Sequence, residues 1–315
     1  KRVVDAANFP HLQAAPRRGR LLAMGVVAGL VLAFAAVYLA RAMQRKLGGV
    51  AAITGAIGWP VYGTIPALSP APTGESTVLG SIWRRGPNAA AEATRALAVC
   101  VSQAPVPGRR GRIVQITSSR SGEGKSTVSA SLAVALARTG ARVLLVDLDL
   151  RKSVQHRTWG IPRAPGFVEL VTRQYDPDAA RALIRRDPTH GVALLPAGTR
   201  AVDTTALLMT DALPAMLAGW AGEYDYVLID SPPAFVPDTS VVARSVDLVL
   251  LIARPGVVER GELNHATGLL ARLAVRKGLV LNGVEPQHLG FGHDHVEDYY
   301  TYGLEDRGED VAGGA

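Results

Sequence analysis

The stretch SSRSGEGKSTVSASLA, residues 118–133, decides the fold of this 315-residue chain. It follows the β-branched run RIVQIT (112–117) and leads into small and apolar residues typical of a helix. A strand, a glycine-rich turn and a helix in this order place successive backbone N–H groups and the positive end of the helix around one anion. The sequence therefore predicts a loop that binds phosphate.

The residues of this loop have separate tasks in the predicted site. Its backbone amides are expected to wrap a β-phosphate, while Lys125 reaches the β- and γ-phosphates and Ser126 offers its hydroxyl to Mg²⁺. The pattern G-x-x-x-x-G-K-[ST] has Ser119 at its first glycine, but the strand and helix on either side support the assignment. The predicted nucleotide-binding residues of the loop are Gly122, Glu123, Gly124, Lys125, Ser126 and Thr127.

Short apolar runs alternate with helical stretches through the rest of residues 108–285. The runs are IVQIT, VLLVDLD, VALLPAG, YDYVLID, LVLLIAR and GLVLN. Strands that are apolar throughout are buried on both faces, as in a parallel sheet covered by helices. We therefore predict an α/β fold with a doubly wound parallel sheet, and a ligand at the carboxyl ends of its strands.

Three acidic residues end two of these runs. Asp147 and Asp149 close VLLVDLD, two residues apart and so on the same side of the pleat, and Asp230 closes YDYVLID. Carboxylates beside a phosphate loop are costly to keep unless a cation or a proton transfer uses them. The alternative for the first two is a helix N-cap with a surface ion pair. Together with the loop, the three carboxylates predict a nucleotide site with Mg²⁺.

An uncharged run of 20 residues, Leu21 to Ala40, precedes this domain. As a helix rising ~1.5 Å per residue it spans about 30 Å, the thickness of a bilayer core. We predict a transmembrane helix over 21–43, after an extended periplasmic or extracytoplasmic segment, 1–20. A cleaved signal peptide is the alternative, but the apolar run is long for one and no A-x-A-like site ends it before Arg41.

The composition points to the compartment of the larger part. A single cysteine, Cys100, excludes an intrachain disulfide and is typical of a reducing compartment such as the cytoplasm. The formal net charge of +7 comes from scattered basic residues without aromatic interleaving or a nucleic-acid motif. Attraction to an anionic membrane surface explains this charge better than nucleic-acid binding.

Two further segments flank the predicted sheet. Residues 44–107 are rich in Gly, Pro and Ala, and we predict a cytoplasmic linker with one docking helix in NAAAEATRALAVCV. Residues 286–315 have almost no aliphatic periodicity and predict a flexible tail. Tyr299, Tyr300 and Tyr302 follow acidic residues in this tail, which suggests an acceptor segment. The alternative is that these rings pack back on the domain.

The motifs SSRSGEGKS, VDLDLRK and LIDSPP, with a tyrosine cluster near the C-terminus, resemble the bacterial tyrosine kinases (BY-kinases). IGWPVYGTIP, EATRAL, LLPAG, LLMTDALPAML and GLVLNGV also fall in the order of that family. In its single-chain form the kinase is fused behind a polysaccharide co-polymerase, or chain-length determinant. The resemblance implies a periplasmic domain and a first membrane helix before Lys1, and a cytoplasmic location for residues after Arg41.

The resemblance also implies roles for single residues. Lys125 and the loop amides would bind phosphates, Ser126 and Asp230 would hold Mg²⁺, and Asp149 would sit next to the metal. Asp147 would orient or deprotonate the attacking tyrosine hydroxyl.

Asn282, at the end of GLVLN, has two interpretations of equal weight. By analogy with the family it would read the adenine ring. As an Asn at a strand end before Gly283, it is also an ordinary turn residue.

The implied activity is that of a membrane-anchored, Mg-ATP-dependent tyrosine autokinase that regulates capsular or exopolysaccharide synthesis. In the family, a helix with E-x-x-R-x-x-R helps to assemble a ring of kinase subunits; here Glu92 and Arg95 match, and Ala98 replaces the second arginine. The expected partners are other copies of the chain, the polysaccharide export and polymerase machinery of the inner membrane, and a phosphotyrosine phosphatase, with no nucleic acid.

Two other functions remain open from the sequence. The membrane-associated partition and division-site ATPases share the phosphate loop, but they carry a signature lysine where this chain has Arg120. They also lack an integral membrane helix and a tyrosine tail. A nucleotide-binding scaffold of the export complex without kinase activity is the other alternative.

Overall fold

The computed structural model describes residues 18–42, 46–68, 78–83, 88–104, 111–173 and 176–285. The chain divides into two units, Lys1–Arg45 and Lys46–Ala315. The tail predicted over 286–315, with its three tyrosines, and most of the segment 1–20 lie outside the described residues.

The first unit contains the helix α1, Arg18–Ala42. Its segment Gly19–Tyr38 has a mean hydropathy of 2.4 over 20 residues, and the side chains from 19 to 38 are exposed. By length and composition this helix can cross a membrane, and the predicted 21–43 span falls largely within it. The helix can therefore serve as a membrane anchor.

The second unit is built on one eight-stranded sheet with the order β1-β8-β7-β2-β6-β3-β5-β4. Every neighbouring pair is parallel except β4 and β5. The strands are β1 (Val61–Pro66), β2 (Arg112–Ser118), β3 (Val143–Asp147), β4 (Arg185–Arg186), β5 (Ala193–Leu195), β6 (Tyr226–Asp230), β7 (Leu248–Ala253) and β8 (Arg276–Val284). All six predicted runs form strands, which confirms the predicted α/β fold.

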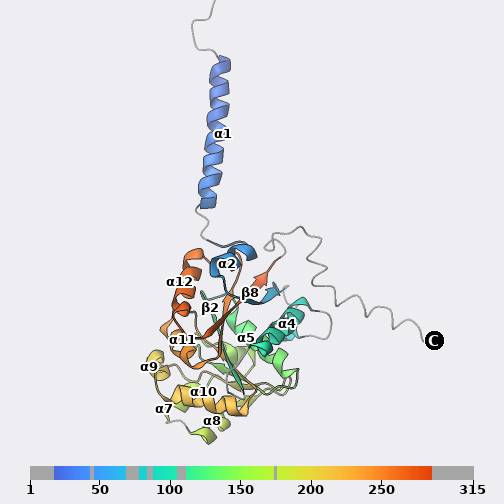
Figure 1. Ribbon diagram of the computed structural model, residues 1–315, viewed down its shortest axis with the longest axis vertical. Coiled ribbons are helices and arrows are strands. Elements are labelled where there is room, and N and C mark those ends of the chain that lie inside the picture. Colours follow the sequence, from blue (N-terminus) through green and yellow to red (C-terminus); the bar gives the residue numbers. More distant parts are fainter. Residues whose placement is uncertain are drawn as a thin grey trace, which may run out of the picture. The chain divides into compact units, whose positions relative to one another are not determined.

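Helices cover both faces of this sheet, so its central strands are buried on both sides (Figure 1). Alternate residues of β7 show the two faces. Leu250 and Ile252 pack in a core with α3, α4 and α5, whereas Val249 and Leu251 pack in a core with α2 and α12. The helices are α2 (Val50–Ile57), α3 (Val78–Ile82), α4 (Ala89–Gln103), α5 (Lys125–Ala137), α6 (Gln155–Thr158), α7 (Phe167–Thr172), α8 (Pro177–Leu183), α9 (Thr204–Leu208), α10 (Ala212–Glu223), α11 (Pro237–Val242) and α12 (Arg260–Ala271), with the 3₁₀ turn η1 (Ala243–Ser245).

The stretch that we predicted to be a linker contributes to this sheet. Its strand β1 pairs in parallel with β8, and α4 packs in the same core as α5. A Cβ atom added to Gly63 of β1 would lie 3.2 Å from the Leu97 Cβ of α4, so the glycine permits this close approach. Gly63 and Pro66, two of the residues that suggested a linker, thus belong to a short edge strand.

Candidate active site

The phosphate loop and the predicted carboxylates meet at one edge of the sheet. Strands β2, β6 and β3 are parallel neighbours, and Ile116, Asp230 and Asp147 are in register across them. Since parallel strands end at the same edge, the loop after β2 lies beside both carboxylates. This is the edge at which a doubly wound sheet binds its ligands.

The loop presents backbone donors to this edge. Gly122 has φ +93° and Gly124 has φ +90°, a left-handed conformation that favours glycine. The helix α5 begins at Lys125, and no side chain caps its first turn. The N–H groups of that turn, which includes Ser126 and the half-buried Thr127, are therefore available to an anion.

The Lys125 side chain points into the cluster of carboxylates. Its Nζ donates a hydrogen bond of 2.7 Å to Asp149 Oδ2 and lies 3.6 Å from Asp230 Oδ1. Burial alone would lower the pKa of Lys125, but attraction to Asp230 and Asp149 offsets this and raises its pKa. The lysine therefore remains charged, and the several N–H donors of its ammonium group allow it to bind a phosphate beside Asp149.

The donor set fits a magnesium ion held jointly with phosphates. Asp230 Oδ1 is buried and has no hydrogen-bond partner, because the 3.6 Å to Lys125 Nζ is too long for one. An unsatisfied buried carboxylate oxygen is costly, and a divalent cation would satisfy it. Within the described ranges, no three His, Cys, Asp or Glu side chains form a metal cage. Mg²⁺ bound through phosphates needs only one or two protein carboxylates.

Asp147 lies next to this cluster and is fully enclosed. It accepts hydrogen bonds from Ser153 Oγ (2.7 Å), Gln155 N (3.2 Å) and Asp149 N (3.2 Å). Burial, followed by repulsion from the Asp230 carboxylate, raises the pKa of Asp147 to about 7. A carboxyl group with this pKa can hold or release a proton near neutral pH.

The two aspartates of VDLD are not related by the pleat as predicted. Strand β3 ends at Asp147, so Asp149 lies in the loop beyond it. The loop nevertheless buries both carboxylates, and Asp149 faces Lys125 while Asp147 faces Ser153. The prediction of two adjacent buried carboxylates holds, but the turn after the strand sets their directions.

A glutamine that the sequence analysis missed orients Asp230. Gln155 Nε2 lies 2.7 Å from Asp230 Oδ2 and also contacts Ser129 Oγ at 2.9 Å and the Ser126 carbonyl at 3.0 Å. Its Oε1 accepts a hydrogen bond of 3.1 Å from Trp159 Nε1. Because both ends of the Gln155 amide are hydrogen-bonded, the side chain fixes the direction of the Asp230 carboxylate. A single Gln in a short helix forms no sequence motif, so this contact could not be predicted.

The Glu123 side chain anchors the phosphate loop from behind. Its carboxylate accepts hydrogen bonds from Ser119 Oγ (2.8 Å), Arg120 N (2.8 Å) and Arg254 N (3.3 Å). Burial raises the pKa of Glu123, and these donors oppose that shift. Glu123 therefore offers only its backbone to a ligand, and its side chain ties the loop to the end of β7.

Asn282 of β8 contacts the same loop. Its Nδ2 donates a hydrogen bond of 2.8 Å to the Glu123 carbonyl. A Cβ atom on Gly124 would lie 2.1 Å from Asn282 Nδ2, so glycine is required there for space as well as for its φ. In this structure the amide of Asn282 supports the loop, a role that neither sequence interpretation included.

The predicted assembly residues lie on α4. Glu92 and Arg95 form an exposed ion pair three residues apart, and the Arg95 guanidinium lies 5.7 Å from the Trp83 ring centroid. Ala98 is buried against α5. Tyr299, Tyr300 and Tyr302 fall outside the described residues, so the structure does not place the predicted acceptors.

Comparisons with known proteins agree with this arrangement. Residues 111–256 match a family model described as an AAA domain. The chain is 32% identical over 203 residues to the tyrosine-protein kinase CpsD of Streptococcus agalactiae, covering 64% of this chain and 85% of CpsD. It is 30% identical over 302 residues to the tyrosine-protein kinase etk of Escherichia coli K12, covering 90% of this chain and 41% of etk. The chain thus spans about two fifths of the length of its longer relatives.

Solved structures of tyrosine kinase domains are also similar to this chain. The kinase domain of the Escherichia coli tyrosine kinase ETK superposes with a TM-score of 0.66 at 27% identity, covering 74% of this chain and 93% of that domain. The BceF tyrosine kinase domain superposes with a TM-score of 0.66 at 29% identity, covering 76% of this chain and 100% of that domain.

Proposed function

Because the chain belongs to the bacterial tyrosine kinases, we propose that it transfers the γ-phosphate of ATP to tyrosines in the C-terminal tail of a neighbouring copy. The observation that carries this proposal is the group of Lys125, Asp149 and Asp230 at the phosphate loop, with Asp147 enclosed beside it. Phosphoryl transfer requires little beyond positioning and charge neutralisation, and this group supplies both.

In this proposal each residue of the site has a separate binding or positioning role. The loop amides and Lys125 bind the phosphates, and Ser126 and Asp230 hold the cation with Asp149 beside it. Gln155 keeps Asp230 in place through its 2.7 Å hydrogen bond. When bound, Mg-ATP supplies the phosphoryl group and neutralises its charge.

Asp147 acts on the acceptor in this scheme. A free tyrosine titrates near pH 10, so a carboxylate within hydrogen-bond reach increases the nucleophilicity of its oxygen. Asp147 accepts the hydroxyl proton as the tyrosine oxygen bonds to phosphorus and the bond to ADP breaks. Its three hydrogen bonds to Ser153, Gln155 and Asp149 hold the carboxylate still.

We also propose the location of the chain and its partners. The helix α1 anchors the chain in the inner membrane, with the residues before it periplasmic and the second unit cytoplasmic. The partners are other copies of the chain, the polysaccharide export and polymerase machinery, and a phosphotyrosine phosphatase. Phosphorylation adds about −1.5 to −2 charges per tyrosine, so phosphorylated tails repel one another and dissociate from neighbouring sites.

One experiment separates this function from its alternatives. The detergent-solubilised chain is incubated with Mg²⁺ and γ-labelled ATP, and mass spectrometry maps the phosphate. We expect label on Tyr299, Tyr300 or Tyr302, and none on a chain with all three changed to Phe. Free phosphate without labelled protein would identify an ATPase, and neither product despite ATP binding would identify a scaffold; both results contradict the proposal.

The role of Asn282 gives a further prediction. If its amide supports the loop through the Glu123 carbonyl, Asn282→Ala weakens ATP and GTP binding equally, by about fivefold to tenfold. Titration of both nucleotides against both chains measures the ratio, with Asn264→Ala on the exposed part of α12 as the control. A loss confined to ATP would show that Asn282 reads the adenine ring instead.

Assembly through α4 gives another prediction. Arg95→Glu is expected to leave the free energy of unfolding within about 1 kcal/mol, because an exposed ion pair contributes little to stability. It should nevertheless shift the particle mass toward the monomer if copies meet through this helix. Light scattering and thermal unfolding measure the two quantities, with Arg260→Glu on α12 as the matched control. An unchanged mass distribution would exclude α4 from the interface.

A further inference from the structure

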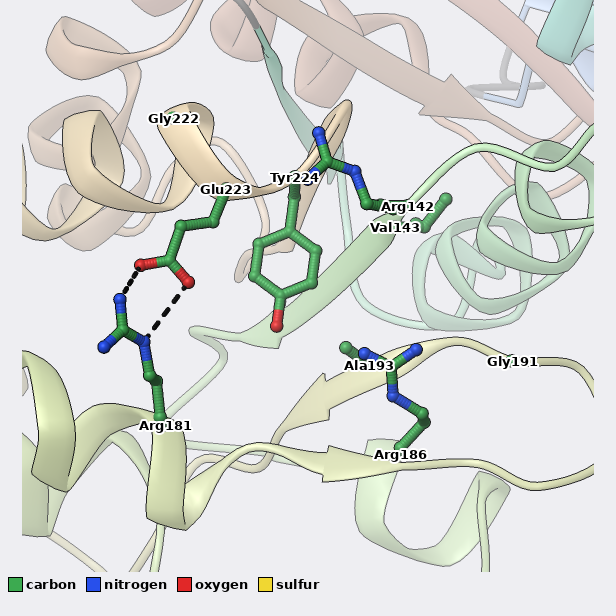
Figure 2. A pocket seen from close by; sticks show the side chains of 9 residues that line it. All are labelled: Arg142, Val143, Arg181, Arg186, Gly191, Ala193, Gly222, Glu223 and Tyr224. Atoms are coloured by element: carbon green, nitrogen blue, oxygen red, sulfur yellow. Dashed lines mark hydrogen bonds and ion pairs between the residues drawn. The ribbon is translucent and has the colours of Figure 1, made fainter.

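A polar cavity lies at the edge of the sheet opposite the candidate active site. Its volume is about 450 Å³, and it is lined from β3, α8, β4, the start of β5 and the end of α10 (Figure 2). Arg142 and Val143 stand at the amino end of β3, whose carboxyl end carries Asp147. None of the proposed catalytic residues lines this cavity.

Three arginines line the cavity. Arg181 binds Glu223 with two contacts, of 2.7 Å and 3.5 Å, and Arg142 binds Asp225 with contacts of 2.9 Å and 3.3 Å. Arg186 forms no ion pair with any carboxylate in the described part of the chain, and it is exposed. Arg181 also binds Asp178 with a contact of 3.0 Å, so Arg142 and Arg181 are both paired, and Arg186 is the lining arginine without an ion-pair partner among the described residues.

Tyr224 adds an aromatic wall and a hydrogen-bond donor. Its ring stands between Arg181 and Arg186, with the hydroxyl directed toward β4 and β5 (Figure 2). Burial raises the pKa of Tyr224, so the hydroxyl stays protonated at neutral pH and can donate. The neighbouring Arg186 guanidinium can form two parallel hydrogen bonds to a phosphate.

The volume of the cavity suits a group larger than a free ion. A Cβ atom added to Gly191 or Gly222 in the lining would meet nothing within 4 Å. A side chain that combines a flat ring with a dianionic phosphate would place its ring along Tyr224 and its charge at Arg186. Among protein side chains, phosphotyrosine has this combination.

We propose that this cavity binds a phosphorylated tyrosine of the chain's own C-terminal tail. The proposal rests on the proposed function for the origin of the phosphate. From Val284, the last residue of β8, to Tyr299 there are 15 residues (299 − 284), which can extend about 50 Å. The strand β8 itself, 9 residues long, spans about 30 Å, and β5 lies five strands away across the sheet, at about 4.8 Å per strand. The straight distance of about 38 Å from the end of β8 to the cavity is therefore shorter than the extended tail.

Occupation of the cavity would hold a phosphorylated tail on the face away from the phosphate loop. The modified segment then cannot return to the active site of a neighbour, and the site stays open for an unmodified tail. Arg181 would exchange Glu223 for phosphate, which makes binding weaken as salt increases.

The test uses a synthetic peptide, so it does not depend on kinase activity. Residues 294–303 are made with phosphate on Tyr300 and a fluorophore, and fluorescence anisotropy measures their binding to the dephosphorylated full chain in detergent. We expect the phosphopeptide to bind at least about tenfold more tightly than the unmodified peptide. Arg186→Ala should weaken this binding about tenfold to a hundredfold, because the exposed arginine provides the unpaired charge.

Matched variants and competitors complete the design. Arg276→Ala, an exposed arginine at the amino end of β8, should leave the affinity unchanged, and Arg186→Lys should restore part of it. Equal binding of both peptides, or binding that Arg186→Ala does not change, would overturn the proposal. Displacement by Mg-ATP would place the peptide in the active site, and inorganic phosphate that binds as tightly as the phosphopeptide would make this a site for the free ion. Label on the tail without an Arg186 effect would leave the kinase function standing and reject only this cavity.

Discussion

Lys125→Met should reduce labelling of the tail tyrosines about a thousandfold. The lysine is the cation that lies among Asp149, Asp230 and the phosphate loop, 2.7 Å and 3.6 Å from the two carboxylates. Methionine keeps the length of the side chain but leaves those carboxylates to repel the phosphates of ATP. Measurement of label per tyrosine over time tests this, with Lys46→Met, exposed at the start of the second unit, as the control.

The same variant tests whether transfer occurs between copies. A Lys125→Met chain keeps its tyrosines but should not phosphorylate them, whereas a chain with Tyr299, Tyr300 and Tyr302 changed to Phe keeps its catalytic site but lacks acceptors. We expect label on the tail of the lysine variant only when the two chains are mixed. Label on the lysine variant alone would show that Lys125 is dispensable, and no label in the mixture would show that each copy modifies itself.

Asp147→Asn should lower the rate of transfer about 10²- to 10⁴-fold and change the affinity for ATP less than about threefold. Asparagine has nearly the same shape and can still accept a hydrogen bond from Ser153, but it cannot take a proton from a tyrosine hydroxyl. Asp147 makes no hydrogen bond to Lys125 in the structure, so nucleotide binding should survive.

Calorimetry of ATP binding and single-turnover labelling separate the two effects of Asp147→Asn. Asp187→Asn, in the turn after β4 and remote from the loop, is the matched control. A parallel loss of affinity and rate would assign Asp147 to nucleotide or cation binding and reject its action on the acceptor.

The parts of the site that follow from local sequence were predictable. The phosphate loop is one continuous segment, and Asp147 and Asp230 end apolar runs that had to be buried parallel strands. Parallel strands end at one edge, so their terminal residues meet without any knowledge of the helices. The sequence therefore specified the loop, the carboxylates and the edge of the sheet together.

The remaining contacts depend on how distant segments pack. The amide of Gln155 reaches Asp230 from a four-residue helix, and Asn282 reaches the loop from a strand more than 150 positions later. Neither residue belongs to a pattern with its partner in the chain. The three arginines that line the polar cavity, Arg142, Arg181 and Arg186, appear in the sequence only as part of the scattered basic charge.

The pairing of β1 with β8 has a consequence for how the domain can be separated from the apolar helix α1. A fragment that starts at residue 108, the predicted domain boundary, would lack β1 and expose the backbone of β8 as a new sheet edge. An unpaired edge strand can form backbone hydrogen bonds with strands of other molecules, so such a fragment would tend to aggregate. Ile65 of β1 lies in register with Asn282, so the cut would also uncover the residue that supports the phosphate loop.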